Sequence, residues 1–280
     1  MSSLTVFNTL ELGLIFSILS FGVYISFRIL NIPDLTVDAS FTTGCAICAV
    51  CTVADASILG LVLAFVAGCL CGLGTEFLQT KMKIQPLLAG ILMMVGLYSI
   101  NLRIMSGAPN LSLFQSKTIF DSLLPDILVL LILVCVVGGC LIVFFKTKIG
   151  LMIRATGDNE GMVRSSSISV DRMKQVGMAL SNGIVSFSGA LLTQYQGFAD
   201  IGGGTGMMVL GLAGIIIGEA VLRKYWVLAC VIGSCLYRLI YQFVLMFGIP
   251  ASDMNLMSAV LGAIMISLPY LSKKRRKGLC

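Results

Sequence analysis

The segment NIPDLTVDASFTTG, residues 31–44, gathers carboxylates and hydroxyl groups between two apolar stretches. Such groups can bind a polar solute. An interrupted helix adds to them, since its unpaired backbone N–H and C=O groups can contact the same solute. A simpler interpretation stays open, in which the segment is an ordinary loop-to-helix boundary with Asp38 or Ser40 as the helix N-cap. On the first interpretation, the candidate substrate-pathway residues here are Asp34, Thr36, Asp38 and Ser40.

A second interruption, YQGFADIGGGTGMMVLGLAGIIIGEA, occupies residues 195–220 in the other half of the chain. Paired interrupted helices, one in each half, are typical of a transporter's binding site. Glycine alone explains the pattern equally well, since Gly202/Gly206 and Gly214/Gly218 are GxxxG spacings that predict close helix packing. The neighbouring helix could belong to the same chain or to a second copy.

Ionisable residues within the apolar stretches are few, and Glu76, Glu219 and Arg238 stand out. Arg238 lies about midway along an apolar run, where an unpaired charge is costly, so it is a functional candidate. The alternative is a structural ion pair with Glu219 or Glu76. Polar amides add to the candidate pathway or form helix–helix hydrogen bonds; these are Asn182, Gln194 and Gln196.

Several chemistries are excluded by what the sequence lacks. It has no histidine, which removes histidine acid–base catalysis, Ser-His triads and histidine-ligated metals. It has no GxxxxGK[ST] stretch, so it does not bind ATP through a P-loop. Its ten cysteines lie mostly in apolar segments and are expected to be reduced, buried side chains. We therefore expect no catalytic residue, no metal site, no cofactor bound by this chain and no nucleic-acid partner.

The composition of the chain predicts what kind of secondary structure holds these residues. Of 280 residues, 58% are hydrophobic and 11% charged, against roughly a quarter charged in soluble domains. Apolar runs near the roughly 20 residues that cross a bilayer occur at residues 12–27, 39–54, 56–75, 84–102, 127–145, 175–199, 201–218, 225–247 and 254–272. The sequence predicts an all-α polytopic membrane protein with about nine (8–10) helices, interrupted or re-entrant segments and two pseudo-repeated halves. Residues 1–280 are expected to form one transmembrane domain without a signal peptide.

The distribution of Lys and Arg predicts the orientation. Basic residues are concentrated at 81–83, 146–174, 223–224 and 273–277, and these groups can all lie on the cytoplasmic side. The C-terminus, with the basic tail 273–280, is then cytoplasmic and the N-terminus outside. The tail can also contact anionic lipid. The long loop 103–126 falls on the outer side and could form a lid or docking surface.

The longest inner loop, about residues 146–174, includes IRATGDNEGMVRSSSISVDRMK. Residues 159–165 favour a short helix behind Asp158 as its N-cap. The loop is either a solvated surface helix or a docking element for another protein.

The run from Ile149 to Asp200 resembles the permease subunits of bacterial ABC importers of the branched-chain amino acid/ribose type. IPDLTVDASFTTG, KMKIQPLLAGILMMVGLYSINLRIMSGAPNLSLF and GLAGIIIGEA support the resemblance, which covers most of the chain. The latter two are similar to a subgroup implicated in uptake of tryptophan or other aromatic amino acids. The chain departs from the family at Ser165-Ser166-Ser167, where a glycine is usual at position 167 and a leucine often precedes it. This departure affects the local geometry of the coupling helix, the short helix that would contact the ATPase.

The resemblance implies a multi-pass permease in the bacterial plasma (inner) membrane. It would pair with a second permease copy above two cytoplasmic ABC ATPases that bind ATP and Mg. A homodimer is the expected pairing, and a heterodimer stays open as the alternative. A binding protein outside would deliver a small polar solute, expected to be an amino acid, with an aromatic one as the narrower case. The implied ATPase-coupling residues are Arg154, Thr156, Gly157, Asp158, Asn159, Glu160, Met162, Val163 and Arg164. The alternative is a secondary transporter or channel without an ATPase, which would need its own coupling-ion site.

Overall fold

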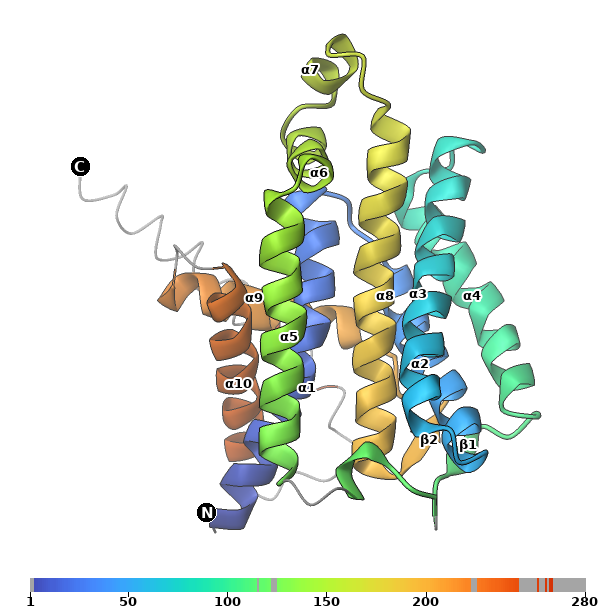
Figure 1. Cartoon of the computed structure of the whole chain (residues 1–280), viewed down its shortest axis with the longest axis vertical. Helices are drawn as coiled ribbons and strands as arrows, with labels where there is room; N and C mark the ends of the chain where they lie inside the picture. Colours follow the sequence, from blue (N-terminus) through green and yellow to red (C-terminus); the bar gives the residue numbers. More distant parts are fainter. Residues whose placement is uncertain are drawn as a thin grey trace.

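The computed structural model describes residues 3–114, 116–121, 125–222 and 226–246, with residues 256, 260, 262 and 263. The predicted last crossing, 254–272, and the basic tail fall almost wholly outside these residues. Within them the chain is an all-α bundle, and seven helices are long and apolar enough to cross a membrane (Figure 1). They are α1 (Ser3–Tyr24, extended by the π-helical turn η1, Ile25–Ile29), α2 (Thr36–Val53), α3 (Ser57–Thr80), α4 (Pro86–Ile104), α5 (Asp126–Lys146), α8 (Val170–Gln196) and α10 (Trp226–Leu245).

The remaining described elements are short. Helix α9 (Met207–Val221) has 15 residues, about 22 Å at 1.5 Å per residue, and is too short to cross a hydrocarbon core of about 30 Å. The crossing predicted at 201–218 is therefore wrong: residues 201–206 form turns and the helix begins only at Met207. The others are α6 (Lys148–Asp158), α7 (Glu160–Ser165), the 3-10 turn η2 (Ile119–Asp121), and strands β1 (Asn110–Ser112) and β2 (Phe198–Asp200).

Helix α8 occupies the middle of the bundle and packs against α1, α2 and α3 (Figure 1). Small residues allow this close packing: a Cβ on Gly44 of α2 would clash with the carbonyl oxygen of Ser186 on α8. The outer helices differ, since long apolar side chains of α3, α4 and α5 are mostly exposed, among them Leu70, Val95 and Val143. Such surfaces suit lipid acyl chains, which confirms the membrane class predicted from composition.

The two GxxxG spacings have different outcomes. Gly202 and Gly206 lie in the turns before α9, and Gly206 has a positive φ of 83°. Gly214 and Gly218 lie on α9 and face α10, because a Cβ on Gly218 would clash with the carbonyl oxygen of Ala229. The partner helix of this spacing is therefore in the same chain.

The two ends of the bundle carry different structures. Helices α6 and α7 project from one end, and the N-terminus and the β1–β2 pair lie at the other (Figure 1). The strands pair antiparallel with Leu111 opposite Ala199, and the N–H of Ile201 donates to the carbonyl of Pro109 at 2.9 Å. The outer loop is thus fastened to the segment that follows α8.

Candidate functional site

The first interrupted helix is held by a closed network of buried polar groups. After η1 the chain is non-helical until α2 begins at Thr36, and Asp34 Oδ1 accepts a hydrogen bond from the N–H of Thr36 at 2.9 Å. Asn182 of α8 donates to Asp34 Oδ2 at 2.7 Å, and its Oδ1 accepts from the Ser40 hydroxyl at 2.7 Å. The Thr36 hydroxyl lies 2.8 Å from that of Thr75 on α3. These side chains fix α2 against α8 and α3, as buried polar groups require.

Asp38 joins the two interrupted helices. Its carboxylate accepts hydrogen bonds from the N–H of Gly206 at 2.9 Å and of Met208 at 2.8 Å, at the N-terminus of α9. The first N–H groups of a helix lack partners within it, and its N-terminus favours negative charge. Asp38 thus caps a helix some 170 positions away in the chain. It does not cap α2, whose N-cap is Leu35 without a side-chain bond.

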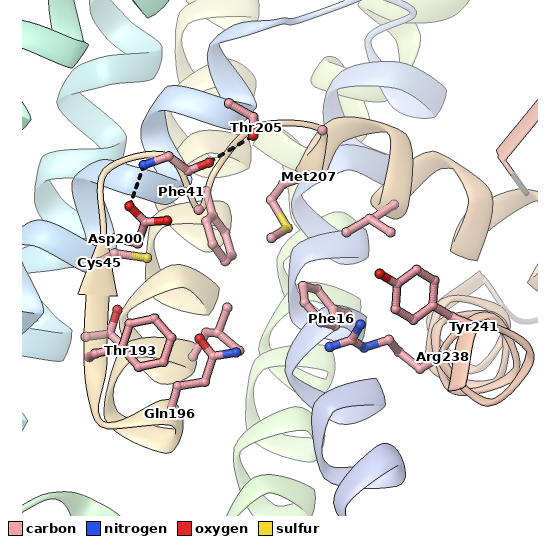
Figure 2. A pocket seen from close by; sticks show the side chains of 16 residues that line it. Phe16, Phe41, Cys45, Thr193, Gln196, Asp200, Thr205, Met207, Arg238 and Tyr241 are labelled. Carbon is pink, nitrogen blue, oxygen red and sulfur yellow. Dashed lines mark hydrogen bonds between the residues drawn. The ribbon is translucent and has the colours of Figure 1, made fainter. Parts of the chain in front are cut away.

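A cavity of about 370 Å³ opens beside this junction, where the end of α8, β2, the turns before α9, and helices α1, α2 and α10 meet (Figure 2). Two candidate pathway residues, Gln196 and Arg238, line it. Asp34, Thr36, Asp38, Ser40, Asn182 and Gln194 do not. The whole lining is Phe16, Phe41, Cys45, Leu192, Thr193, Gln196, Phe198, Asp200, Gly202, Gly203, Thr205, Gly206, Met207, Leu210, Arg238 and Tyr241.

Arg238 contributes a cation to this cavity without a protein anion among the described residues. Its guanidinium carbon lies 4.5 Å from the ring centroid of Phe16 and 5.5 Å from that of Tyr241, within cation–π range. Its buried Nε has no hydrogen-bond partner among these residues. The predicted ion pairs are wrong for the described residues: Glu219 pairs with Arg28, and both carboxylate oxygens of buried Glu76 lack partners.

Polar groups stand on the wall opposite Arg238, where Figure 2 shows Asp200 above Thr193 and Gln196. Asp200 is half-buried; its Oδ1 accepts from the N–H of Gly202 at 3.0 Å and lies 2.9 Å from the Asn110 amide. Sequence reasoning missed Asp200 as a site residue, although it ends the polar YQGFAD stretch.

Gln194 is a structural bridge. Its Nε2 donates to the carbonyl of Ser57 at 2.9 Å, and its Oε1 accepts from the N–H of Ile119 at 3.2 Å. This amide ties α8 to α3 and to the outer loop. Gln194 therefore forms helix–helix hydrogen bonds, the second of the two interpretations given for the polar amides.

The coupling loop folds as two helices. Asn159 is the N-cap of α7, because its Oδ1 accepts from the N–H of Met162 at 3.1 Å. The predicted cap, Asp158, is instead the last residue of α6. Of the candidate coupling residues, Thr156 and Val163 are buried, and Gly157 is half-buried against η1, where a Cβ would clash with the carbonyl oxygen of Ile29. The exposed ones are Arg154, Asp158, Asn159, Glu160, Met162 and Arg164.

Ser167, at the end of this loop, has a φ of 60°. This left-handed region suits glycine, and other residues adopt it at a cost. The resemblance predicts glycine at this position, and the backbone conformation found here is one that glycine adopts readily.

Comparisons with known proteins fit this architecture. The family model described as "Branched-chain amino acid transport system / permease component" matches residues 5–269. The chain is 37% identical over 260 residues to "Tyrosine transport system permease protein" of Clostridioides difficile (strain R20291), covering 91% of this chain and 88% of that protein. It is 33% identical over 270 residues to "Uncharacterized protein RP368" of Rickettsia prowazekii (strain Madrid E), covering 93% and 96%. No solved structure matches.

Proposed function

The chain belongs to the family of branched-chain amino acid transport system permease components, and we propose that it is the membrane subunit of an ATP-driven importer of amino acids, aromatic ones in particular. As a permease component it is an integral membrane protein of an amino acid transport system, a transport component rather than an enzyme. The aromatic preference rests on its similarity to the tyrosine permease.

The observation that best supports an ATP-driven mechanism is the path of helix α8. It begins at Val170, directly after the coupling loop, and ends at Gln196, which lines the cavity. Its 27 residues form a continuous rod of about 40 Å at 1.5 Å per residue. A displacement at the loop would therefore reach the cavity without passing through a flexible joint.

The loop itself is suited to receive a partner. Helix α7 stands at the far tip, where Met162 is 66% exposed, while Val163 on its other face is buried (Figure 1). Glu160 pairs with Lys174 of α8 at 2.6 Å, which ties the tip to the rod. Since the chain has no P-loop, ATP and Mg would bind to two separate ABC ATPases docked here, on the cytoplasmic side.

The opposite end would face outward. The β1–β2 pair lies at this end, where a binding protein would contact the chain, and β2 also lines the cavity (Figure 1). In this orientation the N-terminus is outside, as the distribution of Lys and Arg predicts. The cytoplasmic side of the C-terminus stays a prediction from the basic tail, which lies outside the described residues. A second copy of the chain would complete the transporter, because closed two-fold pairing is the commonest arrangement of homo-oligomers.

A pull-down tests the coupling assignment. Tagged full-length permease is purified from its native membranes, and co-purifying vanadate-sensitive ATPase activity is measured for the parent, Met162→Asp and Arg164→Ala. We expect both variants to lose the ATPase, because α7 presents these side chains at its exposed tip. Arg103→Ala is the matched control, since Arg103 is exposed in the last turn of α4 and does not belong to the coupling loop. Full ATPase recovery with Met162→Asp would refute docking at α7.

An uptake assay distinguishes the proposed ATP-driven importer from a secondary transporter or channel. Accumulation of labelled L-tyrosine is followed in cells after collapse of the proton and sodium gradients, and separately after ATP depletion. The proposal expects uptake to survive the first treatment and to stop with the second. The reverse result would establish coupling to an ion gradient instead.

A further inference from the structure

The cavity beside α9 pairs an unsatisfied cation with an aromatic lining. Arg238 sits midway along α10, where an isolated charge is expensive and normally has a partner. Two acidic side chains of the surrounding helices have other partners: Glu11 accepts from the Tyr195 hydroxyl at 2.7 Å, and Asp38 caps α9. Among the described residues the guanidinium therefore lacks a carboxylate, and a bound solute can supply one.

A guanidinium is well matched to that role. Its planar fork of N–H donors fits a carboxylate through two parallel hydrogen bonds, which an ammonium cannot reproduce. The ring of Phe16 lies against the guanidinium, with 4.5 Å between its centroid and the guanidinium carbon, and both side chains line the cavity (Figure 2). The group is held in position before any solute arrives.

The rest of the lining favours an apolar side chain. Phe16, Phe41, Phe198 and Tyr241 contribute aromatic rings, and Met207 a polarizable thioether. The volume of about 370 Å³ is near the lower end of the roughly 300–1,000 Å³ typical of small-molecule sites. The cavity thus has room for one amino acid.

The wall facing Arg238 has the complementary charge. Asp200 Oδ2 accepts no hydrogen bond from the described residues, and the Gln196 side chain is exposed with no hydrogen bond to them. An ammonium group would meet a carboxylate and an amide oxygen there.

We propose that this cavity is an intramembrane recognition site for aromatic amino acids, in which Arg238 binds the α-carboxylate, Asp200 the α-ammonium and the aromatic lining the side chain. The choice of solute rests on the proposed function, whereas the two charged contacts rest on the geometry. After the binding protein has selected a solute, this site would select a second time, for solutes that carry both the α-carboxylate and the α-ammonium group.

Saturation-transfer NMR on the full-length chain in lipid nanodiscs tests the site without any partner. The probes, at millimolar concentration, are L-tyrosine, tyramine, which lacks the carboxylate, and 3-(4-hydroxyphenyl)propionate, which lacks the ammonium. The parent should bind L-tyrosine about tenfold more tightly than either analogue, the effect of one charge-assisted hydrogen bond. Arg238→Gln should reduce the affinity for L-tyrosine to that of the parent for tyramine. Asp200→Asn should weaken binding of L-tyrosine and tyramine and leave binding of the propionate unchanged.

The controls separate recognition from folding. Arg238→Lys keeps the charge but not the fork, and should bind L-tyrosine at an intermediate level. Arg103→Gln removes an exposed arginine that does not line the cavity and should behave as the parent. The proposal is overturned if the parent gives no saturation transfer from L-tyrosine, if it binds tyramine equally well, or if Arg238→Gln binds as the parent does. Should Arg238→Gln fail to fold, Asp200→Asn tests the site independently, and unchanged L-tyrosine binding in that variant would also overturn the proposal.

Failure of the recognition site can be distinguished from failure of the proposed function. Loss of the co-purifying ATPase from the parent would remove the ATP-driven mechanism and leave the binding results intact. Conversely, ATP-dependent tyrosine uptake that is unchanged in Arg238→Gln and Asp200→Asn would remove the site and leave the importer.

Discussion

The contact between Asp38 and α9 lends itself to a quantitative test by Asp38→Asn. An asparagine keeps the size of the side chain and one acceptor oxygen, but its NH₂ group cannot accept from a backbone N–H. One of the two hydrogen bonds to Gly206 and Met208 is therefore lost, together with the charge at the helix N-terminus.

The magnitude follows from these two losses. A hydrogen bond to a charged group contributes about 1.5–3 kcal/mol, and the lower figure applies because Gly206 is exposed. The helix-terminus charge adds about 0.3–1 kcal/mol. We expect Asp38→Asn to lower the free energy of unfolding by about 2 kcal/mol, and Asp38→Ala, which loses both bonds, by roughly twice as much.

Thermal unfolding of the purified chain measures this effect. Trp226, the one tryptophan of the chain, stacks on Tyr24 at 5.0 Å and reports unfolding by its fluorescence. At about 2–4 °C per kcal/mol, Asp38→Asn should lower Tm by about 4–8 °C.

Asp55→Asn is the matched control, because the Asp55 side chain is exposed and accepts no hydrogen bond from the described residues. Its φ of 57° is one that asparagine tolerates. The Tm of this variant should stay within about 1 °C of the parent. A Tm for Asp38→Asn as high as that of Asp55→Asn would refute the cap between the two interrupted helices.

Two further variants test the coupling loop. Gly157→Ala should force α6 away from the carbonyl of Ile29 and speed trypsin cleavage of the loop, whereas Gly161→Ala, whose Cβ would lie 3.3 Å from Asn159 Oδ1, should leave the digestion rate unchanged; equal rates would contradict the close packing of α6 on η1. Ser167→Gly should relieve the left-handed backbone and stabilise the chain by about 0.5–1 kcal/mol, seen as a higher Tm; an unchanged or lower Tm would contradict the strain assigned to this backbone.

Hydropathy predicts the helices of this chain better than it predicts how many of them cross the membrane. The run 201–218 is as apolar as a crossing, but Gly202, Gly203 and Gly204 adopt turns and leave a helix of 15 residues. Apolar composition measures burial in lipid or protein and does not measure where a helix starts. The positive φ of Gly206, which precedes the start of α9, depends on backbone geometry that no window average includes.

The site shows a similar limit. Residue type is enough to single out the polar side chains in apolar runs, but their partners depend on contacts across the fold. Asp38 is a suitable N-cap by residue type, and sequence spacing assigns it to its own helix rather than to α9. The sequence suggests Glu219 as a partner of Arg238, yet Glu219 lies beside Arg28, a neighbour that sequence distance does not indicate.

The continuity of α8 restricts how this protein can change during evolution. Each residue added to a helix rotates everything beyond it by about 100° and shifts it by about 1.5 Å. An insertion between Asn182 and Gln194 would rotate these two side chains relative to each other. Asn182 could then no longer contact Asp34 while Gln194 contacts Ser57, although all four residues are still present. The two ends of α8 therefore share one helical phase. The number of residues between Val170 and Gln196 should therefore stay fixed.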